Sequence, residues 1–147
     1  MKADEVPEAL ANIPCSIYPT TQGIKTKPLA QMRIGIVSTA GLMHRGEKPF
    51  SLGAVDYRIL DSASSEDLMM SHISTNFDRS GFAADSNLVL PIDRLKEKAS
   101  SGEIGSVAQF HYSFMGATEP EKMKAAAEQL ITTLKGDEVD GLILVPV

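Results

Sequence analysis

The sequence contains little of what several classes of protein need. One cysteine among 147 residues, Cys15, excludes an internal disulfide framework and suits a reducing compartment. No apolar run approaches the roughly 20 residues that span a bilayer. The acidic N-terminus, residues 1–8, lacks the apolar core of a signal peptide. We therefore expect a cytoplasmic protein that makes no contact with a membrane.

Clusters of basic residues and of metal ligands are missing as well. The net charge is -5 and no group of Lys and Arg stands out, so nucleic acid is not an expected partner. The three histidines, His44, His72 and His111, are scattered and Cys15 lies apart from them, which is no metal-ligand pattern. An apolar share of 43% and a charged share of 22% are ordinary for one globular domain of this length.

Apolar runs that alternate with amphipathic helices predict an α/β fold. The run Gly141–Val147 carries no charge and does not alternate, which is typical of a parallel strand covered on both faces. We expect a mostly parallel, Rossmann-like sheet flanked by helices. The other predicted strands are Arg33–Ser38, Tyr57–Leu60 and Val107–Phe114, and the predicted helices are Pro91–Ser101 and Glu119–Lys135.

The remaining segments divide into an arm, two loops and two helix starts. Residues 1–31 hold four prolines and predict an extended arm ahead of a single α/β domain at 32–147. Leu42–Val55 and Ser71–Ser86 lack a helical period and are interpreted as loops. Capping boxes predict one short helix from Ser64 through Met70 and a second helix after Thr118.

Small polar residues follow the first predicted strand. Ser38, Thr39 and Gly41 can present hydroxyl and backbone N–H groups to an anion such as a substrate carboxylate. The alternative is a plain turn of small residues. A second polar cluster follows in the loop after residue 70: we interpret His72 as a proton carrier and Arg79, beside Asp78, as the carboxylate partner. Its alternative is a solvated loop with an Asp78–Arg79 ion pair of little energy.

A third polar cluster ends the strand before the second long helix. His111 and Ser113 would share one face of this strand, and His111 is favoured as a core histidine with an internal hydrogen bond. Ser113 and Gly116 lie near a helix N-terminus, which attracts anions. Because ligands bind beyond the carboxyl ends of parallel strands, we expect all three clusters to converge near Val147 as a substrate-binding site.

Six segments in order resemble one known family. They are Arg33–Leu42, Ser71–Arg79, Leu90–Leu95, Gly102–Val107, His111–Ala117 and Val139–Val147. Together they resemble the glycine/sarcosine/betaine reductase component B and D-proline reductase family, from about residue 32 onward. The resemblance implies a redox subunit of amino-acid-fermenting or related bacteria that acts with other reductase subunits on a small amine or amino acid. It also implies a dithiol donor, a selenocysteine or cysteine just after the final strand, and a pyruvoyl group on a partner subunit.

The sequence departs from this family in one respect. It contains neither the selenocysteine or cysteine after Val147 nor the second cysteine that follows it in the family. Selenocysteine is encoded by UGA, which is ordinarily a stop codon. We therefore expect an N-terminal portion with an incomplete sheet, inactive alone and oligomeric or poorly soluble. The alternatives are a non-catalytic carboxylate-binding or assembly module that ends at Val147, and an unrelated carboxylate-binding α/β domain.

Overall fold

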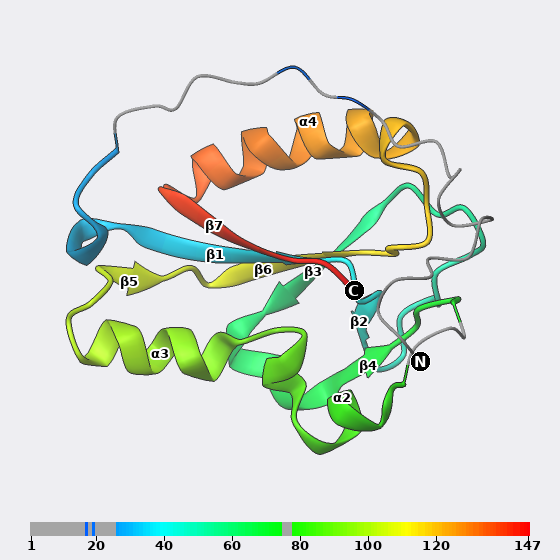
Figure 1. Ribbon diagram of the computed structural model, residues 1–147, viewed down its shortest axis with the longest axis horizontal. Coiled ribbons are helices and arrows are strands. Elements are labelled where there is room, and N and C mark those ends of the chain that lie inside the picture. The colour runs from blue at the N-terminus through cyan, green and yellow to red at the C-terminus, as the bar shows by residue number, and fades with distance from the viewer. Residues whose placement is uncertain (1–16, 18, 20–25, 75–77) are drawn as a thin grey trace, which may run out of the picture.

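The computed structural model describes residues 17, 19, 26–74 and 78–147, and these form an α/β fold around one mixed, mostly parallel sheet (Figure 1). Most of the predicted 1–31 arm lies outside the described residues. The sheet consists of β1 (Arg33–Ser38), β3 (Tyr57–Asp61), β5 (Ser106–Val107), β6 (Phe110–Phe114) and β7 (Gly141–Val145). Strands β5, β6 and β7 run parallel to β1, whereas β3 is antiparallel to β6. The predicted fold class is confirmed.

Strand β1 occupies the interior of the sheet. It pairs with β7 from Ile34 to Ser38, and its other side pairs with β5 at its start and with β6 at its end. The single strand predicted at Val107–Phe114 is therefore two strands with a break between them. At the break, the backbone N–H of Ile36 donates to Nδ1 of His111 over 3.1 Å. His111 is a buried core histidine with an internal hydrogen bond, as its position in the strand predicts.

Two helices cover opposite faces of the sheet (Figure 1). Helix α4 (Pro120–Gly136) packs Leu130 and Leu134 against Tyr112 and Phe114 of β6. Helix α3 (Ile92–Ser100) buries Ile92 and Leu95 in the other core, with Ile34 and Ile36 of β1. Adjacent residues of a strand point to opposite faces, so each strand supplies both cores. Three of the short helical segments are η1 (Leu29–Gln31), α2 (Ser80–Ala84) and η3 (Ser86–Leu88).

The two long helices begin and end within one residue of their predicted bounds, but one predicted cap is absent. Gly102 follows α3 with φ of 76°, a left-handed conformation that suits glycine after a helix. Pro120 is the first residue of α4, where proline loses no helical hydrogen bond. The predicted capping box at Thr118 is wrong, because the Thr118 hydroxyl donates to the carbonyl of Ala54 over 2.7 Å instead.

Three local predictions are wrong. The loop predicted at Leu42–Val55 begins with a strand, β2 (Leu42–His44), and the helix predicted through Met70 is a 3-10 segment, η2 (Ser62–Asp67), followed by β4 (Leu68–Met70). Strands β2 and β4 form an antiparallel pair of three residues each, too short for a period to be visible in sequence. The loop predicted at Ser71–Ser86 contains α2. Asp61, rather than Ser64, caps the N-terminus of η2, since its side chain accepts from the N–H of Ala63.

Candidate functional site

The ends of three parallel strands meet at Thr39, Gly116 and Val147. The N–H of Thr39 donates to the carbonyl of Val145 over 3.0 Å, and the N–H of Val147 donates to Oγ1 of Thr39 over 2.8 Å. On the other side of Thr39, its carbonyl accepts from the N–H of Gly116 over 2.9 Å. The carboxyl ends of β1, β6 and β7 are therefore joined directly, at the edge where α/β sheets bind ligands.

Gly116 makes this junction possible. A Cβ atom at this position would lie 2.7 Å from the carbonyl oxygen of Thr39 and 2.8 Å from the main-chain oxygen of Val147. Both atoms belong to the backbone, so neither can move aside as a flexible side chain would. The absence of a side chain at Gly116 allows three strand ends to approach this closely.

The hydroxyls of Ser38 and Ser113 hold the turn between β1 and β2. Both serines are fully buried. Oγ of Ser38 accepts from the N–H of Ala40 over 3.2 Å, and Oγ of Ser113 accepts from the N–H of Leu42 over 2.8 Å. Together with the bond from the N–H of Gly41 to the carbonyl of Phe114, every N–H group from Thr39 to Leu42 has a partner within the chain. The turn is thus rigid, and Thr39 is its most accessible polar side chain.

His72 lies against the same turn. The N–H of Ser71 donates to the carbonyl of Gly41 over 2.8 Å, and a Cβ on Gly41 would lie 2.9 Å from the nitrogen of His72. The φ of Gly41 is 64°, which also favours glycine. Burial lowers the pKa of His72, the charge of Arg79 lowers it further, and a hydrogen bond with the backbone of Ser74 raises it. The lowered pKa favours the neutral imidazole.

Arg79 and Asp78 differ in what they contact. The guanidinium of Arg79 donates to the carbonyl of His72 over 2.6 Å and also to the carbonyl of Ser74, so it braces the loop that carries His72. Asp78 accepts from both the N–H and the hydroxyl of Ser80, each over 2.8 Å, which lowers the pKa of its carboxyl. These bonds tie Asp78 to the start of α2 rather than to the strand ends.

The structure thus brings most of the predicted site residues together. Around the ends of β1 and β6 it gathers Ser38, Thr39, Gly41, His72, Ser113 and Gly116. Thr39 and Gly116 lie directly beside Val147. Arg79 is connected to these residues by its hydrogen bond to the carbonyl of His72, whereas Asp78 contacts none of them. Their roles in binding a substrate stay predictions. The sequence analysis did not predict the hydrogen bond between the Thr39 hydroxyl and Val147. Gly116, directly after β6, was the one sign in the sequence that backbone segments approach closely at this point.

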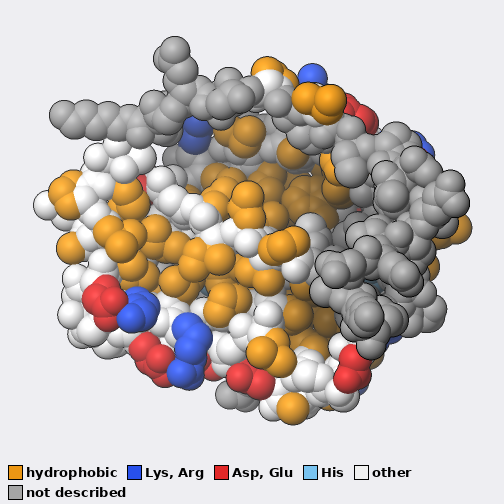
Figure 2. Space-filling view, viewed as in Figure 1, with side chains coloured by type: hydrophobic (Ala, Val, Ile, Leu, Met, Phe, Trp, Pro, Cys, Tyr) orange, Lys and Arg blue, Asp and Glu red, His pale blue; other side chains and the backbone are white. Residues whose placement is uncertain are grey.

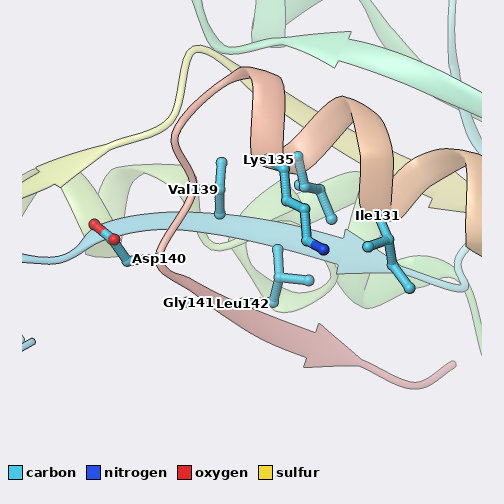
Figure 3. A pocket seen from close by; sticks show the side chains of 7 residues that line it. Ile131, Lys135, Val139, Asp140, Gly141 and Leu142 are labelled. Atoms are coloured by element: carbon cyan, nitrogen blue, oxygen red, sulfur yellow. The ribbon is translucent and has the colours of Figure 1, made fainter. Parts of the chain in front are cut away.

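Strand β7 carries a large exposed apolar surface beside this junction. Figure 2 shows hydrophobic side chains across the middle of the face on which Figure 1 draws β7. Leu144 is 70% exposed, and Leu142, Ile143 and Val147 are also exposed. A groove of about 280 Å³ separates β7 from α4 and is lined by Ile131, Leu134, Lys135, Val139, Asp140, Gly141 and Leu142 (Figure 3). A second groove, of about 470 Å³, lies on the α3 side.

The part of the chain that the structure describes has neither a cluster of metal ligands nor a helix suited to a membrane. No group of three His, Cys, Asp or Glu side chains within residues 26–74 and 78–147 is placed to hold a metal ion. Among the helices of this same part of the chain, none combines the length and the apolar character that crossing a membrane requires.

Comparison with known proteins identifies the family. Residues 17–147 match the model of glycine/sarcosine/betaine reductase selenoprotein B. The chain belongs to this family. The resemblance seen in its six segments is thereby confirmed, over most of the chain rather than at isolated motifs. No solved structure is significantly similar to this one.

Curated relatives carry the names of related reductases. The D-proline reductase subunit gamma of Acetoanaerobium sticklandii is 30% identical over 81% of this chain and 50% of its own length. The betaine reductase complex component B subunit beta of Peptoclostridium acidaminophilum is 30% identical over 80% of this chain and 28% of its own length. The glycine reductase complex component B subunit gamma of the same organism is 27% identical over 83% of this chain and 29% of its own length. The chain thus spans about half the length of the first relative and less than a third of the others.

Proposed function

We propose that this chain is the N-terminal portion of a selenoprotein B-type reductase subunit that acts in reductive cleavage of glycine, sarcosine, betaine or a D-proline-like substrate. The family match over residues 17–147 is the observation that carries this proposal. The names of the relatives cover all four substrates, so we assign none of them in particular.

The reaction that we propose breaks one C–N bond. The carbon takes up two electrons and a proton, the nitrogen leaves as an amine or, in a ring, stays attached by its other bond, and a dithiol donor is oxidised to a disulfide. The nucleophile would be a selenocysteine or cysteine directly after Val147. The end of β7 suits such a residue, because Thr39 and Gly116 hold the backbone of Val147 at the ligand-binding edge. A pyruvoyl group on a partner subunit would activate the substrate amine.

His72 and Arg79 are the side chains of this chain that we assign to the substrate. A neutral imidazole can accept a proton, and the pKa of His72 is lowered toward that form. The guanidinium of Arg79 suits a carboxylate, for which it would exchange one of its backbone contacts. We expect the 147-residue chain alone to be inactive, because the nucleophile that we propose follows Val147. We also expect it to work in the cytoplasm with other reductase subunits.

The exposed surface of β7 favours a second candidate, a non-catalytic binding or assembly module. A parallel strand is normally covered on both faces, whereas Leu142, Ile143 and Leu144 are exposed here. A partner protein could cover this surface without any chemistry taking place on the chain.

The codon after Val147 separates the two candidates. UGA followed by an open frame with a nearby cysteine supports the reductase, and UAA or UAG supports the module. The activity test expresses the longer frame with cysteine at its first new position and adds partner subunits, an amine substrate and a dithiol. We expect weak turnover, because a free thiol has a pKa of about 8.5 and is largely protonated at pH 7. The 147-residue chain is the control, and turnover by this control would contradict the proposed nucleophile.

A further inference from the structure

The hydroxyl of Thr39 accepts a backbone hydrogen bond beyond the end of the β1–β7 pairing. Backbone pairing of β1 with β7 ends at Ser38 and Val145, and Pro146 has no N–H to donate. Beyond this point Oγ1 of Thr39 accepts from the N–H of Val147 over 2.8 Å and lies 3.4 Å from its main-chain oxygen. One side chain therefore takes the place of a strand partner for the first residue after the proline.

Gly116 lies close to the same residue. The oxygen of Val147 lies where a Cβ on Gly116 would almost touch it, and the N–H of Gly116 is bound to the carbonyl of Thr39. In a chain that continues beyond Val147, the peptide group after it is planar, so the position of the Val147 oxygen would also set the direction of the bond to the following residue. Thr39 and Gly116 together thus orient whatever follows β7.

We propose that Thr39 is a positioning residue, which aims the residue after Val147 by holding the Val147 backbone against Gly116. This inference rests on the proposed function only in naming that next residue as the nucleophile. Misplacement of a reacting atom by about 1 Å can cost on the order of a hundredfold in rate. The loss of one hydrogen bond at this position can therefore lower kcat strongly.

The first experiment uses the 147-residue chain and does not depend on the proposed function. Amide exchange at Val147 is measured by NMR in the wild type, in Thr39→Val, which keeps the shape without the hydroxyl, and in Thr39→Ser, which keeps the hydroxyl. We expect exchange at Val147 to be roughly tenfold faster in Thr39→Val and near wild type in Thr39→Ser. The amide of Ile143, which lies within β7, is the internal reference for unfolding. Unchanged exchange at Val147 in Thr39→Val would overturn the inference.

The second experiment uses the longer chain with cysteine after Val147 and its partner subunits. We expect Thr39→Val to lower kcat on the order of tenfold or more with little change in KM, and Thr39→Ser to restore kcat. Thr132→Val is the matched control, because Thr132 is exposed on α4 and its hydroxyl also bonds to a carbonyl, that of Glu128. Faster exchange without a fall in kcat would make Thr39 merely structural and overturn the inference. Absence of turnover in the unsubstituted longer chain would instead contradict the proposed function.

Discussion

Nδ1 of His111 accepts the main-chain N–H of Ile36 over 3.1 Å, at the break between β5 and β6. The side chain replaces the strand partner that Ile36 lacks there. Nε2 of the same ring is buried and has no hydrogen-bond partner among the described residues. The imidazole must therefore be neutral in the folded chain, because a second proton would place an unpaired charge in the core.

The first prediction concerns pH. Burial is the largest cause that lowers the pKa of His111 to about 4. The charge of Lys96 also lowers this pKa, and the charge of Asp61 raises it. The unfolded chain, with a histidine pKa near 6.5, binds more protons between those two values. The contribution of His111 to the free energy of unfolding should therefore be complete above pH 6.5. It should fall by up to about 3 kcal/mol as the pH drops toward 4.

Urea unfolding between pH 7.5 and pH 4.5 measures this loss. His111→Asn is the control, since its side-chain oxygen can accept from Ile36 but does not titrate in the window. We expect the variant to be less stable at pH 7.5 and to lose less stability on acidification than the wild type. Any contribution of His72, whose pKa is also lowered, is common to both proteins. Parallel pH profiles of the two would refute the prediction.

A second prediction compares one substitution at two glycines. Gly116→Ala places a methyl group within 2.8 Å of two backbone oxygens and should cost about 2 kcal/mol of stability. Gly136→Ala, at the end of α4, meets no atom within 4 Å and should be neutral or stabilising by up to about 1 kcal/mol. Chemical denaturation of both variants tests the difference. Equal effects would show that the strand ends approach less closely than described.

A third prediction concerns the apolar surface of β7. Its second edge pairs with no other strand in the described part of the chain, and the strand carries no charge. Such an edge favours association, which lysine opposes. Leu144→Lys should therefore reduce self-association in sedimentation velocity, whereas Leu52→Lys, at a site 82% exposed in the loop before β3, should have no effect. A monodisperse wild-type monomer would contradict this prediction and favour the assembly module.

The fourth prediction concerns the start of β7. Oδ2 of Asp140 accepts from the N–H of Arg33 over 2.9 Å, and Oδ1 is paired with Lys27 over 2.8 Å. Both contacts lower the pKa of this carboxyl, that of Lys27 more. Asp140→Ala should nevertheless destabilise the chain more than Lys27→Ala, because the first leaves a backbone N–H without its acceptor and the second removes only an exposed charge. Thermal unfolding at neutral pH compares the two variants, and the reverse order would refute the argument.

The long elements could be predicted because their patterns are repeated. Strand β7 and helix α4 each contain enough apolar residues for length and period to identify them. Within α4, Ala126 packs against the core whereas Ala127 is exposed, a difference that the helical period alone does not decide. Strands β2 and β4 could not be predicted, because each gains its partner only when residues 42 and 70 meet in space.

The candidate site was predictable in its location but not in its contacts. The carboxyl ends of parallel strands must share an edge, which placed Thr39 and Gly116 near Val147. Burial decides the rest. Ser38 and Ser113 are polar residues that a sequence suggests are available for a ligand, yet both are fully buried and bond to the backbone. No local pattern shows which hydroxyl will be needed inside the chain.

The place of β1 between β6 and β7 has a consequence for synthesis on the ribosome. The contact of Arg33 with Asp140 joins residues 107 positions apart, so β1 emerges long before the strand that covers its second side. Until β7 arrives, Val37 and its neighbours present an unpaired edge in the nascent chain. Closing such long-range parallel pairs is slow and leaves apolar segments open to wrong partners. The nascent chain therefore has a period in which a chaperone would protect it, and that period ends when β7 is threaded beside β1.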